Sequence, residues 1–168
     1  MSQSRVELLQ CMPVFHGLRE DTLRVLLAAS NIACVPAGEY FFRQGDDALY
    51  MYVLESGEVG IEKSWLDREL DLGKLGPGDC FGEMALIELS SRSASITAVS
   101  DCTAIEISAV HLQSVHDFDI EQFIVIQSNI ARELCRRLRM ADESRLRAVP
   151  ARADFTDSQL SWPQILAI

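Results

Sequence analysis

One stretch of this 168-residue sequence decides how the rest is interpreted: Phe81-Gly82-Glu83-Met84-Ala85-Leu86-Ile87-Glu88-Leu89-Ser90-Ser91-Arg92-Ser93-Ala94-Ser95-Ile96-Thr97-Ala98. A Gly-Pro-Gly turn at residues 76–78 leads into it, and Gly82 allows the backbone to approach another group closely. A single helical turn is predicted over Met84–Ile87, and the free N–H groups at the start of a helix favour an anion. The first half of the stretch therefore indicates a place for a negatively charged group.

Two charged side chains refine this interpretation. Arg92 follows Gly82 by ten residues and offers a planar fork suited to phosphate, and the small side chains after it leave room for a ligand. Glu83 would repel an anion, so its presence is explained if its carboxylate accepts a hydrogen bond from a hydroxyl group, as an acid does with a ribose. One anion, one hydroxyl and a compact site together indicate a ribose phosphate.

The sequence around this stretch predicts a mainly β domain. Short β-rich runs alternate with turn signals from Asn31 to about Ser108. The runs are Ile32–Val35, Tyr40–Arg43, Leu49–Leu54, Val59–Lys63, Leu70–Leu75, Ser95–Val99 and Cys102–Ile107. Many short strands with this spacing indicate a sandwich, a jelly roll or a small barrel.

Helices are predicted on both sides of the strands. Two short ones, Val6–Met12 and Asp21–Ser30, come first, and Ser108 is a suitable N-cap for a third at Ala109–His116. Asp117 or Asp119 then caps a long helix from Ile120 to about Arg147. Its apolar stripe consists of Ile120, Phe123, Ile130, Leu134, Leu138 and Ala141. Because this stripe is longer than one small sheet can cover, we expect a helix of a partner subunit to cover the remainder.

The stretch 81–98 resembles the phosphate-binding cassette of cyclic nucleotide-binding domains. The family pattern is Phe-Gly-Glu-(Leu/Met)-Ala-Leu, a short loop, and Arg-(Ala/Ser/Thr)-Ala-(Ser/Thr)-(Ile/Val), and the spacing from Gly to Arg fits. Upstream turns at 36–39, 44–46 and 56–58 resemble the family as well, so that the resemblance covers roughly residues 6–145. One departure is the loop 88–91, which contains neither Pro nor Gly, so its conformation is expected to differ.

The resemblance implies the ligand-binding residues Gly82, Glu83, Met84, Ala85, Arg92, Ser93 and Ala94. Glu83 is expected to bind the ribose 2′-hydroxyl group, and Arg92 to pair with the cyclic phosphate. Backbone N–H groups of Ala85 and Ala94 should add phosphate contacts. The ligand is thus expected to be cAMP or cGMP, with no cofactor and no metal.

Three residues of this set have other implied roles. Gly82 and Met84 should line the sugar, and the Ser93 hydroxyl group should meet the phosphate. Ser93 matches the family's bacterial activators, which favours cAMP over cGMP. Residues 92 and 93 are therefore expected to recognise the phosphate together.

The implied fold is a mainly β double-stranded β-helix, or jelly roll, with flanking helices. It divides the chain into N-terminal helices at 1–30, the jelly roll at 31–108 with its cassette at 81–98, hinge and dimer or lid helices at 109–147, and a tail at 148–168. The tail is either a disordered terminus or a flap whose Trp162 stacks on the base. The family's activators continue into a helix-turn-helix domain, for which the 21 residues after Arg147 are too few.

The charge distribution argues against bulk binding to nucleic acid. The chain has 25 acidic and 15 basic side chains and a net charge of −10, which repels phosphate backbones. Residues 131–152 differ, because they carry 7 Arg and 3 acids. We expect these arginines to lie on a solvated helix face.

The cysteines and the remaining motifs exclude several classes of protein. The five cysteines never form Cys-x-x-Cys, so a disulfide scaffold, a zinc ribbon and an iron–sulfur cluster lack support, and most are expected to pack in the core. The start has no signal-peptide pattern, and no long apolar run could span a bilayer. We found no catalytic motif. The sequence therefore predicts a cytoplasmic protein that is not an enzyme.

We accordingly expect a cyclic nucleotide sensor that transmits ligand binding through movement of its C-terminal helix. It should form a homodimer through the 120–145 helix and act on an effector protein, without direct contact with nucleic acid or membrane. Two alternatives remain. One is a ligand-free dimerisation scaffold of the same fold, and the other is the sensor half of a transcription regulator that lacks its DNA-binding domain.

Overall fold

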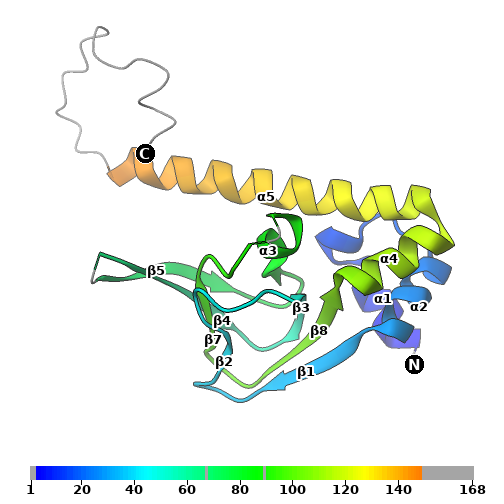
Figure 1. Cartoon of the computed structure of the whole chain (residues 1–168), viewed down its shortest axis with the longest axis horizontal. Coiled ribbons are helices and arrows are strands. Elements are labelled where there is room, and N and C mark those ends of the chain that lie inside the picture. The colour runs from blue at the N-terminus through cyan, green and yellow to red at the C-terminus, as the bar shows by residue number, and fades with distance from the viewer. Residues whose placement is uncertain (1–2, 67, 89, 149–168) are drawn as a thin grey trace, which may run out of the picture. The chain divides into compact units, whose positions relative to one another are not determined.

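The computed structural model describes residues 3–66, 68–88 and 90–148 (Figure 1). The chain divides into two compact units, 1–133 and 134–168, and each is described by itself. The first unit holds all the strands given below, together with the helices at the N-terminus. The predicted tail at 148–168, with its Trp162 flap, lies outside the described residues except for Ala148.

Eight strands are found within the described residues, and seven of them lie where the sequence predicted them. They are β1 Asn31–Val35, β2 Tyr40–Phe42, β3 Tyr50–Ser56, β4 Val59–Trp65, β5 Arg68–Leu75, β6 Cys80–Phe81, β7 Ser95–Ala98 and β8 Cys102–Ser108. The additional strand, β6, has two residues, which is too short to give an alternating pattern in the sequence. All pairings are antiparallel and form two four-stranded sheets, in the orders β1-β8-β3-β6 and β2-β7-β4-β5.

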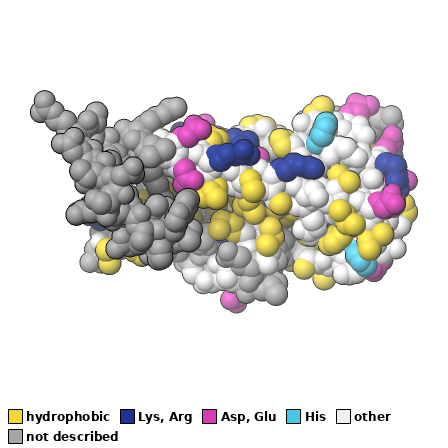
Figure 2. Space-filling model, turned by 90° about the horizontal axis from the view of Figure 1, so that it is seen from above, with side chains coloured by type: hydrophobic (Ala, Val, Ile, Leu, Met, Phe, Trp, Pro, Cys, Tyr) yellow, Lys and Arg dark blue, Asp and Glu magenta, His cyan; other side chains and the backbone are white. Residues whose placement is uncertain are grey.

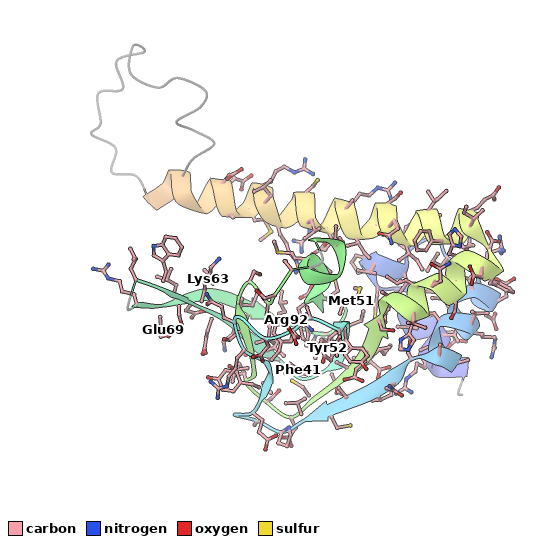
Figure 3. All side chains as sticks on the ribbon, in the orientation of Figure 1. Phe41, Met51, Tyr52, Lys63, Glu69 and Arg92 are labelled. Atoms are coloured by element: carbon pink, nitrogen blue, oxygen red, sulfur yellow. The ribbon has the colours of Figure 1, made fainter. Side chains whose placement is uncertain are left out.

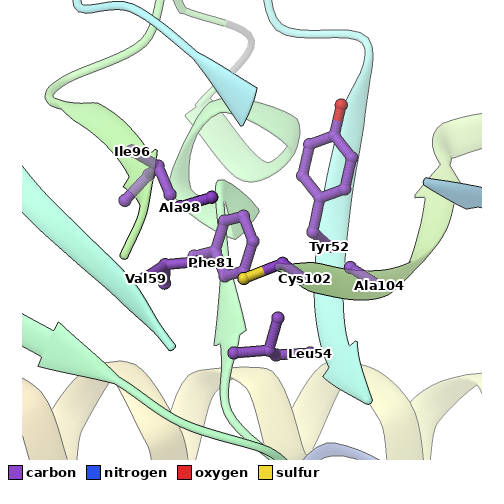
Figure 4. Close-up of a cluster of buried hydrophobic side chains, with 8 residues drawn as sticks. All are labelled: Tyr52, Leu54, Val59, Phe81, Ile96, Ala98, Cys102 and Ala104. Atoms are coloured by element: carbon purple, nitrogen blue, oxygen red, sulfur yellow. The ribbon is translucent and has the colours of Figure 1, made fainter. Parts of the chain in front are cut away.

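The two sheets enclose an apolar core (Figure 4). Its buried side chains are Tyr52, Leu54, Val59, Phe81, Ile96, Ala98, Cys102 and Ala104. The rings of Tyr52 and Phe81 are stacked 5.4 Å apart, and Phe41 meets both edge-on at 5.2 and 5.0 Å. Because Phe81 begins the cassette, this aromatic cluster anchors the cassette in the core. The arrangement is the jelly-roll fold that the sequence analysis predicted.

Strand β3 is buried on both faces. Tyr52 and Leu54 point into the core between the sheets, while Met51 and Val53 are buried on the other face. Helices cover that second face (Figure 1). An ion pair between Arg5 and Glu55, with N–O distances of 2.6 and 2.9 Å, holds the first helix, α1 (Gln3–Gln10), near the end of β3.

The helices are α1 Gln3–Gln10, a 3₁₀ turn η1 at Pro13–Phe15, α2 Glu20–Ala29, α3 Glu83–Glu88, α4 Ala109–Phe118 and α5 Ile120–Ala148. The last four agree closely with the predicted ones, whereas α1 begins and ends before the predicted Val6–Met12, and η1 was not predicted. Ser108 caps α4 as predicted, because its hydroxyl group accepts a hydrogen bond from the N–H of His111. Of the two candidate caps for α5, Asp119 is the one used, and its carboxylate accepts from the N–H groups of Glu121 and Gln122.

The predicted apolar stripe of α5 needs correction. Ile130 is buried, but Ile120 and Leu138 are 55% and 62% exposed. Figure 2 shows hydrophobic side chains gathered at the end of the face where α4 ends and α5 begins, where Phe118 and Ile124 are exposed as well. The residues buried together with Ile130 are Gln122, Ile126, Asn129 and Glu133. Three of these four are polar, so the covered face of α5 is largely polar.

Polar side chains occupy this face because they satisfy backbone groups near the N-terminus. The Asn129 side-chain amide donates to the carbonyl oxygens of Val14 and His16, at 3.0 and 2.8 Å. The Gln122 side-chain oxygen accepts from the N–H of Arg19 at 2.8 Å. A pattern of apolar residues could not reveal this face, because hydrogen bonds rather than apolar contacts select its residues.

The expectation that most cysteines pack in the core is also wrong. Cys80 and Cys102 are buried, whereas Cys11, Cys34 and Cys135 are exposed. Cys11 follows the end of α1, and Cys34 lies on β1, an edge strand of its sheet, so neither position requires burial. No helix within the described ranges is long and apolar enough to cross a membrane, and no three His, Cys, Asp or Glu side chains there form a metal site.

Candidate functional site

The cassette has two arms that meet at Gly82 and Arg92. The first arm leaves the core through β6, turns at Gly82 with a φ of +76°, and continues into α3. The second arm comes back through Arg92 and enters β7. Since Phe81 and Ile96 are both core residues, the two arms are fixed at their outer ends.

Arg92 is the central residue of the site. Its side chain is buried, with 4% exposure, and Figure 3 shows it close to Tyr52 between the strands. One terminal nitrogen, Nη1, donates to the carbonyl oxygen of Gly82 at 3.0 Å, and the other, Nη2, donates to that of Tyr50 at 2.6 Å. The guanidinium carbon lies 3.9 Å from the ring centre of Phe42, which gives a cation–π contact.

One of the three nitrogen atoms of the Arg92 guanidinium group is left without a partner among the described residues. Within the part of the chain that the structure describes, the buried Nε–H of Arg92 has no hydrogen-bond partner. A buried N–H without an acceptor costs free energy, and for a charged group the cost is higher. An anionic ligand that reaches this nitrogen would remove that cost, so the site favours an anion.

Burial and nearby acids have opposite effects on the charge of Arg92. Burial lowers the pKa of Arg92, while the groups of Tyr52, Asp46 and Glu83 raise it by favouring the positive charge. Arginine stays charged in proteins at any ordinary pH, so the site retains a buried cation. Glu83, 3% exposed, is buried beside it. The pair offers an anion-binding donor set and a hydroxyl acceptor within one site.

Gly82 allows the close approach that the sequence predicted, and the structure shows that the approaching group is the Arg92 side chain. A Cβ atom added to it would lie 2.4 Å from Nη1 of Arg92 and 3.3 Å from the ring of Phe42. Its positive φ is a second reason for glycine at this position. The space that a larger residue would fill is taken by the arginine itself. Whether Gly82 also lines a sugar stays a prediction.

The other predicted residues lie around these three. Met84 and Ala85 are in the first turn of α3, and Met84 is 41% exposed. Ser93 and Ala94 follow Arg92 directly, and the Ser93 hydroxyl oxygen lies 4.0 Å from the Met84 sulfur. The contact between Ser93 and Met84 shows that the two arms come together on the exposed side of Arg92.

Several groups that hold Arg92 were missed by the sequence analysis. Phe42 and the carbonyl group of Tyr50 contact its side chain from β2 and β3. The turn that includes Gly45 and Asp46 binds its backbone. The 44–46 turn was noted for its resemblance to the family, but no local signal in the sequence points to Phe42 or Tyr50, because they reach the site through strand pairing.

Comparison with known proteins places this geometry in a family. The family model described as cyclic nucleotide-binding domain matches residues 33–117, which include the whole cassette. The chain belongs to the cyclic nucleotide-binding domain family. The prediction made from the stretch 81–98 is therefore confirmed at the level of family and fold.

Similar proteins occur in bacteria and in eukaryotic parasites. The chain is 34% identical, over 131 residues, to the cyclic AMP receptor protein of Thermus thermophilus, covering 77% of this chain and 59% of that protein. The crystal structure of Thermus thermophilus catabolite activator protein superposes with a TM-score of 0.69 at 33% identity, over 79% of this chain and 61% of that one. The regulatory domain of Toxoplasma gondii PKA, crystallised with cAMP, superposes with a TM-score of 0.62 at 28% identity. The match covers 68% of this chain and 46% of that chain.

The chain thus spans about three-fifths of the length of the bacterial relatives that it matches. Both kinds of relative are regulatory proteins by name.

Proposed function

We propose that this chain is a sensor module that binds a cyclic nucleotide, with cAMP preferred over cGMP. Arg92 pairs with the cyclic phosphate, Glu83 accepts a hydrogen bond from the ribose 2′-hydroxyl group, and Ser93 adds a contact to the phosphate. Backbone N–H groups of Ala85 and Ala94 complete the phosphate contacts, and Gly82 and Met84 lie beside the sugar. The module breaks no bond of the ligand.

The observation that carries this proposal is the buried Arg92, whose Nε–H lacks an acceptor among the described residues, beside the buried Glu83. A cation and an acid in one site, both shielded from water, match a ligand that carries an anion and a hydroxyl group. The acid disfavours simple anions such as sulfate, because it repels an anion that offers no hydrogen-bond donor in return.

The preference for cAMP is supported by relatives and by one residue. The names of two relatives state that they respond to or were crystallised with cAMP. Ser93 matches the family's bacterial activators.

The output of the sensor is proposed to run through α5. This helix begins next to the domain, where Asp119 caps it, and continues for 29 residues. A change in its position on ligand binding would alter dimerisation through 120–145 or docking of an effector protein. A cytoplasmic location, inferred from the sequence, belongs to the same proposal.

Thermal unfolding with added nucleotides tests the proposal. A ligand that binds the folded chain raises its melting temperature, and at a concentration one hundred times the Kd the gain is about 2.7 kcal/mol, or roughly 5–10 °C for a domain of this size. We expect this shift with cAMP, a smaller one with cGMP, and little with the open-chain 5′-AMP. No shift with either cyclic nucleotide at millimolar concentration would contradict the proposal and favour a ligand-free scaffold.

A further inference from the structure

The backbone of Arg92 is held by the turn after β2. The N–H of Gly45 donates to the carbonyl oxygen of Arg92, and the N–H of Arg92 donates to that of Asp46, both at 2.9 Å. The turn is closed by its own bonds, because the N–H of Arg43 donates to the Asp46 carboxylate at 2.8 Å and the N–H of Asp46 donates to the carbonyl oxygen of Arg43 at 3.1 Å. The position of this turn therefore fixes the backbone of Arg92, and with it the point at which the side chain is attached.

Gln44, in the middle of the turn, ties it to β4. Its side-chain oxygen accepts from the N–H of Ser64 at 2.9 Å, and its side-chain nitrogen donates to the carbonyl oxygen of Ser64 at 3.3 Å. Its backbone N–H donates to the hydroxyl oxygen of Ser95 on β7 at 2.9 Å. One residue thus joins the turn to two strands.

The sheet explains why a side chain is needed at this place. Strand β7 pairs with β4 from Val59 to Glu62, so the backbone groups of Ser64 lie beyond the end of that pairing. On its other side Ser64 pairs with Glu69 of β5. The side-chain amide of Gln44 has an acceptor oxygen and a donor nitrogen, as the backbone of a strand does. It therefore pairs with the N–H and carbonyl groups of Ser64 in place of a neighbouring strand.

We propose that Gln44 is a positioning residue for Arg92. It fixes the turn 44–46 to the end of β4, and the turn fixes the backbone of Arg92 and thereby the direction of the guanidinium group towards the phosphate of the ligand. The inference rests on the proposed function for the identity of the ligand. The hydrogen bonds by which Gln44 holds the turn to β4, here called the Gln44 clamp, can be tested without any ligand.

The first test is amide hydrogen exchange in the ligand-free protein. In Gln44→Ala we expect the N–H groups of Gly45 and Arg92 to exchange roughly fivefold faster, because the turn has lost two hydrogen bonds. The N–H of Gly78, which donates to the carbonyl oxygen of Leu54 elsewhere in the fold, serves as an internal reference and should not change. Gln44→Glu can accept from the Ser64 N–H but cannot donate to its carbonyl oxygen, so it should give an intermediate rate. Unchanged exchange at Gly45 and Arg92 would overturn the clamp.

The second test is a double-mutant cycle on cAMP affinity. Gln44→Ala should weaken binding roughly fivefold in the wild-type background and by less than about twofold in an Arg92→Leu background, because its effect passes through Arg92. Gln10→Ala, at an exposed glutamine of α1, is the matched control and should leave the affinity unchanged. An equal loss in both backgrounds would mean that Gln44 acts on the fold in general and not on Arg92. If the wild type binds no cyclic nucleotide, the proposed function fails, and hydrogen exchange alone decides on the clamp.

Discussion

At Gly82 the site has no room for a methyl group. We expect Gly82→Ala to push the Arg92 guanidinium group away from the carbonyl oxygens that hold it, since Nη1 lies where the new Cβ would be. Stability should fall by about 1–3 kcal/mol, and cAMP affinity by roughly tenfold or more. Urea unfolding and calorimetry measure the two effects.

Gly38→Ala is the matched control for this prediction. Gly38 has a φ of +85°, similar to that of Gly82, but nothing lies within 4 Å of its would-be Cβ. Gly38→Ala should lower the free energy of unfolding, because alanine is strained at a positive φ, and should leave cAMP affinity intact. Equal loss of affinity in both variants would rule out the contact with Arg92 as the cause.

Glu83 is expected to act through one hydroxyl group of the ligand. Glu83→Ala should weaken binding of cAMP by about tenfold, and should have little effect on 2′-deoxy-cAMP, which lacks the donor. Calorimetric titration of both proteins with both ligands measures this. If the two ligands lose affinity equally, Glu83 has another role, such as pairing with the Arg92 charge.

At this scale the sequence predicted the contiguous residues and missed the others. Glu83 and Arg92 were proposed as ligand-binding residues from one continuous stretch, in which Glu83 directly follows Gly82 and Arg92 comes ten residues after it, and that role stays a prediction. Phe42 and Gln44 contact or position Arg92 from a strand and a turn about fifty residues earlier. Such contacts depend on strand pairing across the sheet, and one sequence without a structure does not give the register.

The elements were predicted well, and the faces of α5 were not. Helix starts such as Ser108 and Asp119 carry local signals, because a side chain caps the backbone within three residues. The covered face of α5 is chosen by carbonyl groups near the N-terminus, which Asn129 binds. Apolar periodicity contains no information about such partners.

The start of α5 gives a prediction on pH. Asp119 caps this helix and pairs with Arg19, whose hydrogen bond holds the pKa of the Asp119 carboxyl below its ordinary value of 3.8. The folded state therefore favours the charged carboxylate, and its stabilising effect is present above that value and is lost as the pH falls below it. Asp119→Ala should lower the melting temperature by roughly 5 °C at neutral pH, and the deficit should shrink at acid pH.

Asp117→Ala is a suitable comparison for this element. Its carboxyl also has a lowered pKa, through hydrogen bonds with His116 and Gln113, but both of these partners lie on α4. We expect a smaller change in melting temperature. An Asp119 deficit that stays constant down to the acid range would contradict the role assigned to its charge.

For the whole molecule, the proposed dimer depends on the second half of α5. Leu138 is exposed in the single chain, and with Leu134 it continues the apolar stripe that the sequence predicted. Leu134→Asp combined with Leu138→Asp should turn a dimer into a monomer, because the charges would be buried between helices. Light scattering measures the mass. Met140→Asp, at another exposed apolar position of the same helix, should leave the dimer intact, and a wild type that is monomeric at high concentration would refute the dimer.

The central claim, that a cyclic nucleotide binds through Arg92, is tested most directly by calorimetric titration of wild type and Arg92→Leu with cAMP under identical conditions. The buried guanidinium group supplies the charge that pairs with the phosphate, so its loss should weaken binding by about 2–4 kcal/mol while the chain remains folded by circular dichroism. We expect one cAMP per chain in the wild type. In the variant, the Kd should be higher by the factor that corresponds to this difference in binding free energy. Equal dissociation constants for the two folded proteins would contradict the account.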